Sequence, residues 1–346
     1  MRVRRRRLPL IAAAAVFLLL LMGVYGAQAS SGKSAKTVQI AVFGYNTTPY
    51  ALANRKAAEA AAKQYGAKIT FFNPNSDAQL QATQIQDAIT TGKYQAFWIS
   101  ANDGHRLQPL VKQAAAKGIK VGVSDQTLGG TGEQVTLQTK PGVTITIGTG
   151  LKTQAVTGVS EIKAACAAQV GAGKPCSVAL MAGFDNFPPD VYRYGYITKA
   201  LKKTGITTKF MPQGQYAAPG AQKSTLDFFQ SKPKVDVIYT SADQMIAGVL
   251  VALGQLHITP GKDLKLIGFG ATTEAIAGIK AGTWYASLGL YPSTSARLGV
   301  KYLVDAVNGK TVPKLIDVYK LPGALPVIDA AILKSHASFK ADWSYG

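Results

Sequence analysis

Asp125 is the residue whose type and position point most directly to chemistry. In the stretch "GIKVGVSDQT" it follows the alternating apolar residues Ile119, Val121 and Val123, in a chain with only 18 acidic residues. A carboxylate at the end of such a strand can cap the backbone of the turn that follows. It can also bind a ligand, because ligands of parallel α/β sheets bind beyond the carboxyl ends of the strands. This stretch alone leaves both alternatives open.

The other residues with catalytic or metal-binding chemistry form no recognisable site. His105, His257 and His336 lie far apart, and none has a Cys, His or Glu neighbour at a metal-ligand spacing. The stretch "GVSDQ" lacks the second glycine of a nucleophile elbow, and "VGAGKP" lacks the Ser or Thr of a phosphate loop. Both "GTGLKT" and "GFGATT" lack the third glycine of a dinucleotide fingerprint. We therefore expect a binding protein without metal or cofactor rather than an enzyme.

The N-terminus has the pattern of a secretory signal peptide: five arginines, an apolar run from Leu8 to Val24, and a small-residue site that ends at Ala29. We expect residues 1–29 to be removed on export to the periplasm or the cell-envelope exterior, and residues 30–36 to form a polar linker. An uncut membrane anchor is the alternative, although the apolar run is short for a spanning helix.

The chain without its first 29 residues remains basic, with 33 Lys and Arg against 18 Asp and Glu, a net charge of about +15. The lysines are scattered and not interleaved with aromatic residues, so we expect no nucleic-acid binding. Attraction to an anionic cell surface or an acidic habitat fits this charge better. The two cysteines, Cys166 and Cys176, flank "AAQVGAGKP", and in an oxidising compartment we expect them to form a disulfide. The alternative is two buried free thiols.

Strand and helix patterns alternate along most of the chain, which predicts an α/β fold with mostly parallel sheets. The pattern occurs twice, so we expect two similar Rossmann-like lobes with a cleft between them for a small molecule. One helix is expected to end at Gly66, and another to begin with a capping box of Ser76 and Gln79. The expected strands are 37–43, 67–72, 94–100, 120–124, 143–148, 177–182, 207–212, 235–241 and 264–269, and the expected helices are 50–66, 76–91, 106–117, 153–169, 191–204, 221–230, 244–256 and 274–282.

Several of these segments, in this order and spacing, resemble the ribose-type periplasmic solute-binding proteins of ABC transporters. The matching pieces are "TPYALANRKAAEAAAKQYGAKI", "QATQIQDAITTGKYQAFWIS", "AAAKGIKVGVSD", "YTSADQMIAGVLVAL" and "LIGFGATTEAIAGIKAGTWYASLGLYP". The resemblance implies a type I periplasmic binding protein fold: two lobes, a three-strand hinge and a ligand cleft between the lobes. By analogy the crossovers fall near Gly148, Leu290 and Asp317. The implied lobes are 37–148 plus 291–317 at the N-terminal side and 149–290 plus 318–346 at the C-terminal side.

The resemblance also implies where a ligand binds, and several positions depart from the family pattern. Asp125 stands where the family places a sugar-binding aspartate, and Tyr50 where it has a stacking phenylalanine. Gly270 and Leu290 stand where an aspartate and a glutamine are usual. The candidate ligand-binding residues are Tyr45, Thr47, Thr48, Tyr50, Asp125, Gln126, Tyr192, Arg193, Tyr216, Asp243, Gly270 and Leu290.

Among the other candidates, Gln126 replaces an arginine of ribose binders, and Tyr192 takes the position of the family's arginine, with Arg193 one residue late. Asp243 matches the family's aspartate. The wall contributed by the C-terminal lobe should therefore be more apolar and aromatic than is usual, which favours a less hydroxylated sugar derivative or a flat, partly apolar solute.

We expect an exported, monomeric receptor that captures a sugar or sugar-like ligand by hinge closure and delivers it to the permease of an ABC importer. One alternative is a sensor that docks on a membrane histidine kinase. Another is a binder of a non-sugar solute such as a nucleoside or other heterocycle.

Overall fold

The structure of this chain is a computed structural model that describes residues 37–44, 48–125, 128–129 and 135–346. The expected signal peptide 1–29 and linker 30–36 lie outside these residues, as do the candidate site residues Tyr45, Thr47 and Gln126. Residues Val38–Gly346 form one unit. None of the helices in the described ranges is both long and apolar enough to cross a membrane.

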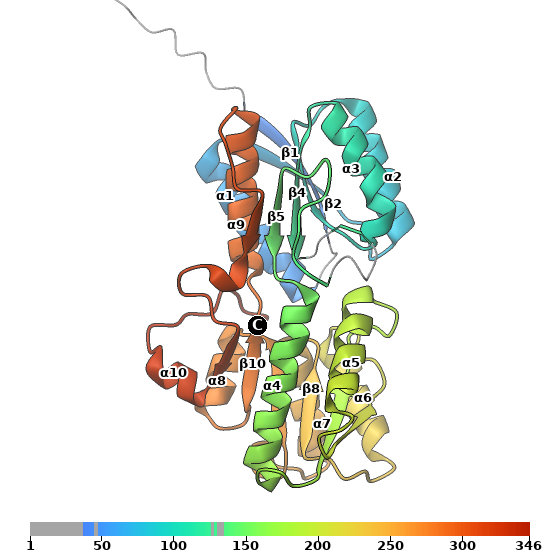
Figure 1. Ribbon diagram of the computed structural model, residues 1–346, viewed down its shortest axis with the longest axis vertical. Helices are drawn as coiled ribbons and strands as arrows, with labels where there is room; N and C mark the ends of the chain where they lie inside the picture. Colours follow the sequence, from blue (N-terminus) through green and yellow to red (C-terminus); the bar gives the residue numbers. More distant parts are fainter. Residues whose placement is uncertain (1–36, 45–47, 126–127, 130–134) are drawn as a thin grey trace, which may run out of the picture. The chain divides into compact units, whose positions relative to one another are not determined.

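Lobe 1 is built on a six-stranded sheet in the order β11-β5-β4-β3-β1-β2, in which every pair of neighbours is parallel. Helices α1 and α9 cover one face and α2 and α3 the other (Figure 1). With both faces covered, the central strands are buried and mostly apolar, as is usual for parallel sheets. The elements are β1 (Val38–Phe43), α1 (Pro49–Tyr65), β2 (Ala67–Phe72), α2 (Ala78–Thr91), β3 (Ala96–Ser100), α3 (Gly104–Ala116), β4 (Lys120–Asp125), β5 (Ile145–Gly148), α9 (Pro292–Val307) and β11 (Leu315–Asp317).

Lobe 2 repeats this design with the order β12-β10-β9-β8-β6-β7, in which only β12 runs antiparallel to its neighbour. Helices α4 and α5 pack on one face of this sheet, and α6, α7 and α8 belong to the apolar core on the other (Figure 1). Its elements are α4 (Leu151–Val170), β6 (Cys176–Met181), α5 (Pro188–Leu201), β7 (Ile206–Phe210), α6 (Ala218–Phe229), β8 (Val237–Thr240), α7 (Asp243–Gln255), β9 (Lys265–Gly270), α8 (Thr273–Lys280), β10 (Ala286–Gly289), β12 (Val327–Asp329) and α10 (Ala330–Ser335). The 3-10 helix η1 (Val318–Lys320) follows β11, and its residue Val318 packs in the apolar core of lobe 1.

The described chain passes between the two sheets at three places: after β5, after β10 and after β11. These places coincide with Gly148, Leu290 and Asp317, where the resemblance put the crossovers. The two-lobed α/β architecture expected from the sequence is therefore confirmed. The lobe boundaries given above, residue by residue, remain a proposal.

The helix ends show which local signals were interpreted correctly. Helix α1 ends at Gly66, whose φ of +71° is the left-handed conformation that glycine adopts at helix C-caps. The capping box of Ser76 with Gln79 is wrong. Asp77 is the N-cap of α2 and accepts hydrogen bonds from the backbone N–H groups of Gln79 at 2.7 Å and Leu80 at 3.0 Å. Ser76 has a φ of +62°, whereas an N-cap residue needs extended backbone.

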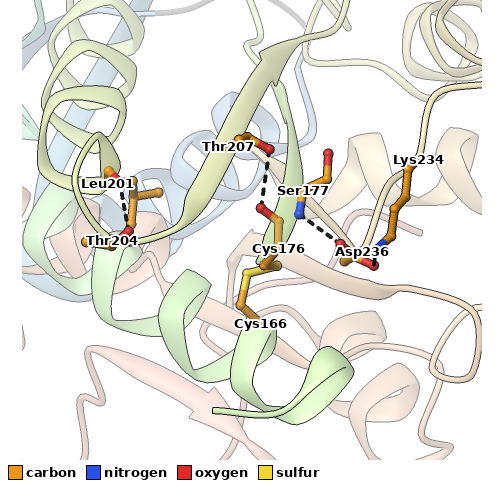
Figure 2. Close-up of a disulfide and its surroundings, with 8 residues drawn as sticks. All are labelled: Cys166, Cys176, Ser177, Leu201, Thr204, Thr207, Lys234 and Asp236. Atoms are coloured by element: carbon orange, nitrogen blue, oxygen red, sulfur yellow. Dashed lines mark hydrogen bonds and ion pairs between the residues drawn. A yellow bond between two sulfur atoms is a disulfide. The ribbon is translucent and has the colours of Figure 1, made fainter. Parts of the chain in front are cut away.

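The disulfide expected between Cys166 and Cys176 is present (Figure 2). Cys166 lies near the end of α4 and Cys176 begins β6, and their Cα atoms are 5.8 Å apart. Both residues are buried in the core that α4 and α5 form with the sheet. The bond therefore fixes the α4–β6 connection within lobe 2, away from the cavity described next.

Candidate ligand-binding site

A cavity of about 170 Å³ lies between the two lobes. One water molecule needs about 10–15 Å³ of such space, so the cavity can hold a much larger solute. It opens at the carboxyl ends of the strands, where parallel α/β sheets bind ligands. The lining residues are Thr48, Tyr50, Ser76, Asn102 and Asp125 from lobe 1, and Leu151, Gln154, Phe184, Phe187, Pro189, Arg193, Tyr216, Ser241, Ala242, Gln244, Phe269, Leu290 and Trp343 from lobe 2.

Asp125 is the last residue of β4 and has a φ of +67°, so the strand turns sharply at the carboxylate. Its side-chain oxygens accept hydrogen bonds from three hydroxyls: Tyr50, Ser100 at 3.1 Å and Ser124 at 3.2 Å. Burial raises the pKa of Asp125 above its usual value, and these hydrogen bonds offset part of that effect. The carboxylate is thus held half-buried at the cavity wall, where it can accept further hydrogen bonds from a solute.

Tyr50, which hydrogen-bonds to this carboxylate, belongs to an aromatic pair that lines the cavity. Tyr50, in the first turn of α1, donates its hydroxyl to Asp125, and its ring meets the ring of Trp343 edge to face, with centroids 5.8 Å apart and planes at 87°. Trp343 is 5% exposed, and its Nε1–H donates to the carbonyl of Gly270 at 2.9 Å. Aromatic faces of this kind pack against the C–H groups of a sugar or another partly apolar solute.

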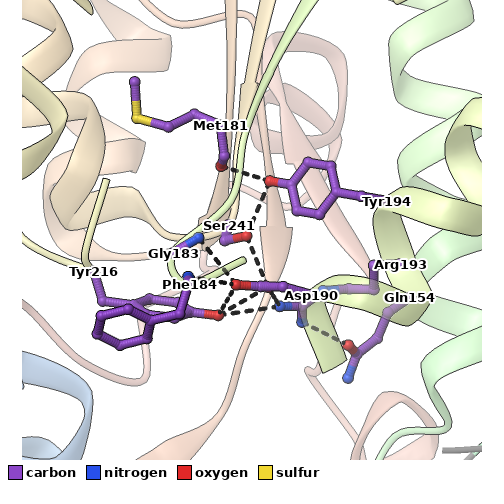
Figure 3. Close-up of polar contacts among 9 residues, drawn as sticks. All are labelled: Gln154, Met181, Gly183, Phe184, Asp190, Arg193, Tyr194, Tyr216 and Ser241. Atoms are coloured by element: carbon purple, nitrogen blue, oxygen red, sulfur yellow. Dashed lines mark hydrogen bonds and ion pairs between the residues drawn. The ribbon is translucent and has the colours of Figure 1, made fainter. Parts of the chain in front are cut away.

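The wall from lobe 2 is organised around Asp190, which is 1% exposed (Figure 3). Its carboxylate accepts from the backbone N–H groups of Gly183 at 2.9 Å and Phe184 at 3.2 Å, and from the hydroxyls of Tyr216 and Ser241, each at 2.9 Å. Asp190 therefore fixes the loop after β6 and the Tyr216 ring against the first turn of α5.

Arg193 completes this network one helical turn along α5. Its guanidinium donates to Asp190 at 2.5 Å and to the side-chain oxygen of Gln154 at 3.0 Å (Figure 3). It also lies 4.8 Å from the centroid of the Phe269 ring. Burial opposes the charged form, but the charge of Asp190 outweighs it and raises the pKa of Arg193. Arg193 and Asp190 form a buried, hydrogen-bonded ion pair. The N–H groups of the Arg193 guanidinium are therefore held in fixed positions at the cavity wall.

Within the described part of the chain, two buried polar atoms of cavity-lining residues have no hydrogen-bond partner: Nδ2 of Asn102 and Oε1 of Gln244. Both side chains are otherwise held in place. The backbone N–H of Asn102 donates to Gln81 at 2.8 Å, and Nε2 of Gln244 donates to the carbonyl of Tyr216 at 3.3 Å. A buried polar atom without a partner costs about 1–3 kcal/mol. A ligand that supplied one acceptor and one donor would recover this cost.

The structure brings six of the sequence candidates together at the cavity. They are Thr48, Tyr50, Asp125, Arg193, Tyr216 and Leu290. Tyr192, by contrast, is not among the described residues that line it, and its ring stacks on Tyr196 with centroids 6.3 Å apart. The one-residue offset of Arg193 is therefore resolved by the helix: residue 193, and not residue 192, faces the cavity.

Asp243 and Gly270 also lie outside the set of described lining residues. Asp243 is fully buried and accepts hydrogen bonds from Ser287 at 2.7 Å and from the backbone N–H of Thr272 at 3.0 Å, so it supports the turn after β9. A Cβ atom at Gly270 would lie 2.6 Å from Oδ2 of Asp243 and 3.0 Å from the Trp343 ring. Position 270 therefore has no room for a side chain, because Asp243 and Trp343 fill its surroundings.

Sequence reasoning missed several residues that shape the cavity: Asn102, Gln154, Asp190, Ser241, Gln244 and Trp343. A signal existed for Asp190, because Asp and Arg three apart on a helix can pair. Another existed for Asn102, which follows the third expected strand by two residues. No local pattern identifies Trp343, which reaches the cavity from residues 341–346, far along the chain from Tyr50.

The arrangement is suited to hold a neutral, partly polar solute. It offers a carboxylate for hydroxyl groups, a charged Asp–Arg pair with tyrosine and serine hydroxyls, and aromatic surfaces. Among the described residues, no group of three His, Cys, Asp or Glu side chains could hold a metal ion.

Comparisons with known proteins agree with this architecture. The ribose import binding protein RbsB of Bacillus subtilis (strain 168) is 24% identical over 288 residues, which cover 83% of this chain and 87% of that protein. A Mycobacterium smegmatis protein in complex with β-D-fucofuranose has a TM-score of 0.72 at 17% identity, with 87% of this chain and 94% of that chain covered. An ABC transporter solute-binding protein from Bacillus halodurans C-125 with bound myo-inositol has a TM-score of 0.71 at 16% identity, with 87% and 98% covered.

The likeness to the solved structures shows the shared fold. The family assignment rests on the sequence. A family model described as "Periplasmic binding protein domain" matches residues 40–311, which is most of the chain. The resemblance drawn from the sequence pieces is thereby confirmed, and the chain belongs to the periplasmic binding protein family.

Proposed function

We propose that this protein is an exported receptor that captures a sugar or sugar-like solute in the cavity between its lobes and delivers it to the permease of an ABC importer. The observation that carries the proposal is the composition of the cavity wall. The Asp125 carboxylate and the side chains of Asn102 and Gln244, each of which has one unpaired polar atom, line the same cavity as the rings of Tyr50 and Trp343. Hydroxyl groups on an otherwise C–H surface match both parts of this wall.

The family relationship supports the same role. The curated relative is a ribose import binding protein, and solved structures of the same fold hold sugars and myo-inositol. We infer that the receptor acts in the periplasm or at the cell-envelope exterior, as a monomer. Its role is binding rather than catalysis, and no histidine or cysteine occurs among the described residues that line the cavity.

Ligand capture should involve closure of the two lobes about the three passages between the sheets. Small-angle scattering should therefore give a smaller radius of gyration when the solute is saturating. An unchanged radius at saturation would contradict capture by hinge closure.

A thermal-shift screen against sugars, polyols, nucleosides and amino acids tests the ligand class. A ligand present at 100 times its dissociation constant adds about 2.7 kcal/mol to the free energy of unfolding, which is readily detected. We expect the largest shifts from sugars or polyols. Shifts from nucleosides or amino acids alone would contradict the proposed class. Reconstitution with the permease and ATPase separates import from sensing, since a receptor that only docks on a kinase would stimulate no ATP hydrolysis.

A further inference from the structure

The segment 341–346 is held by both lobes and forms part of the cavity wall. Asp342 accepts hydrogen bonds from the backbone N–H groups of Ser293 at 2.7 Å and Thr294 at 3.2 Å, in the first turn of α9 on lobe 1. On lobe 2, the carbonyl of Trp343 accepts from the N–H of Thr273 at 3.2 Å, and Oε1 of Glu274 accepts from the N–H of Gly346 at 3.0 Å. Trp343 is thus fixed in position between these anchors.

Trp343 offers a solute no polar group. The Nε1–H of its indole is its sole donor, and this donor is used by the carbonyl of Gly270. The neighbouring position 270 cannot provide a polar side chain, because a Cβ atom there would lie 3.0 Å from the Trp343 ring and closer still to Asp243. Neither Trp343 nor position 270 therefore offers a free polar side-chain group to a solute.

Trp343 and Tyr50 together form a corner. Their rings meet at 87°, and the hydroxyl proton of Tyr50 is donated to Asp125. The hydrogen-bond donors of both rings are already used, so a hydroxyl group placed against them would lose donors from water that the rings do not replace, which is costly in a closed site. A methyl group or a C–H edge would instead gain contact with both rings.

We propose that Trp343 is a specificity-determining residue that selects deoxygenated sugars over the parent sugars that carry one more hydroxyl. The inference rests on the proposed function and adds the chemistry of one end of the ligand. Hydroxyls of the solute face Asp125, and the position that lacks oxygen faces the corner of Tyr50 and Trp343.

Matched pairs of sugars test this selection by calorimetric titration. Suitable pairs are D-ribose with 5-deoxy-D-ribose, D-galactose with D-fucose, and L-mannose with L-rhamnose. In the pair that binds best, we expect the deoxy sugar to bind at least about fivefold tighter. Trp343→Ala should weaken binding of the deoxy sugar about tenfold, through the loss of ring contact. It should also reduce the preference to within twofold.

Tryptophan emission gives a second readout that a structural role would not produce. The chain has three tryptophans, of which Trp98 and Trp284 are buried in the cores and Trp343 lines the cavity. Binding should change the emission of the wild type, and this change should be lost in Trp343→Phe and kept in the matched control Trp284→Phe. Trp343→Phe keeps an aromatic ring and serves as the second variant if Trp343→Ala does not fold.

The outcomes separate the inference from the proposed function. A parent sugar that binds as tightly as its deoxy partner overturns the inference, and so does a preference that survives Trp343→Ala or binding that leaves the emission unchanged. In each of these cases sugar capture itself stands. If none of the six sugars binds the wild type, the selection by Trp343 is refuted for these sugars. The proposed function then stands if the thermal-shift screen finds another sugar or polyol, and it falls if that screen finds none.

Discussion

Replacement of Asp125 by Asn should separate the ligand role of this carboxylate from a structural one. The amide has nearly the shape of the carboxylate but lacks its charge. An NH2 group, which is a hydrogen-bond donor, replaces one of the two carboxylate oxygens. In the fold, the carboxylate accepts hydrogen bonds from Tyr50, Ser100 and Ser124, all side-chain hydroxyls that can also reorient toward an amide oxygen. The perturbation is therefore mainly a loss of negative charge at the cavity wall.

The expected loss of affinity follows from the hydrogen bonds that the carboxylate can make to a solute. Hydrogen bonds to a charged group contribute about 1.5–3 kcal/mol each, so the loss of one or two of them should cost about 2–4 kcal/mol. This corresponds to a dissociation constant about 30-fold to several hundred-fold higher.

The thermal stability of Asp125→Asn should stay the same or rise slightly, although its affinity for the solute falls. Burial raises the pKa of Asp125, so folding disfavours the ionised form of this carboxyl relative to the unfolded chain. For such a group, the stabilising contribution is present below its unfolded pKa and is lost as the pH rises through its folded pKa. At pH 7, Asp125→Asn should thus melt at the wild-type temperature or slightly above it.

Calorimetric titration and a melting curve on the same preparation decide between the two roles. The matched control is Asp87→Asn, which removes an exposed carboxyl on α2 and should change neither quantity. A lower melting temperature with affinity within two- to threefold of the wild type would refute the reasoning, because that is the signature of a carboxylate that only caps its turn.

Three further predictions concern other parts of the fold. Burial raises the pKa of Asp243 to about 6, so its contribution to stability is present below about pH 4 and is lost as the pH rises through 6. In denaturant titrations, Asp243→Asn should therefore gain up to about 3 kcal/mol relative to the wild type between pH 4 and pH 7, and a difference independent of pH would contradict this. The disulfide of Cys166 and Cys176 closes a loop with a sequence separation of 10, so its removal should lower the free energy of unfolding by about 2–3 kcal/mol. Unreduced, denatured protein should contain no titratable thiol, and two thiols per chain would show that the bond does not form. Asp342→Ala should cost about 1 kcal/mol in chemical denaturation, because it removes the acceptor at the first turn of α9; an unchanged midpoint would mean that water replaces this cap.

Much of the fold could be predicted because local signals agreed with the global architecture. The strands of lobe 1 are apolar runs that alternate with helices, and glycine at position 66 marks a helix end by its own conformational preference. The elements after residue 282 gave no such pattern. Strands β10, β11 and β12 have three or four residues each, too few for a periodic signal. Helix α9 begins with Pro292 and hydroxyl residues of low helix propensity, and it is held by packing on lobe 1 and by Asp342.

Only those residues of the candidate site that a local pattern locates could be predicted from the sequence. Asp125 could be found because it ends a strand, and strand ends of a parallel sheet meet at one edge. Arg193 could be found, but its orientation depends on the rotation of α5, and the structure turns residue 193 inward and Tyr192 outward. Trp343 could not be found, because its position depends on contacts with α8, α9 and Gly270 that no local pattern encodes.

The central claim is that the cavity between Asp125 and Trp343 holds the solute. A crystal structure of the protein with the sugar that gives the largest thermal shift tests it most directly. The account predicts electron density for one sugar molecule in this cavity, with a hydroxyl within hydrogen-bond distance of the Asp125 carboxylate and a C–H face against the Trp343 ring. Density for the sugar at another place, with this cavity filled by water at a saturating concentration, would contradict the account.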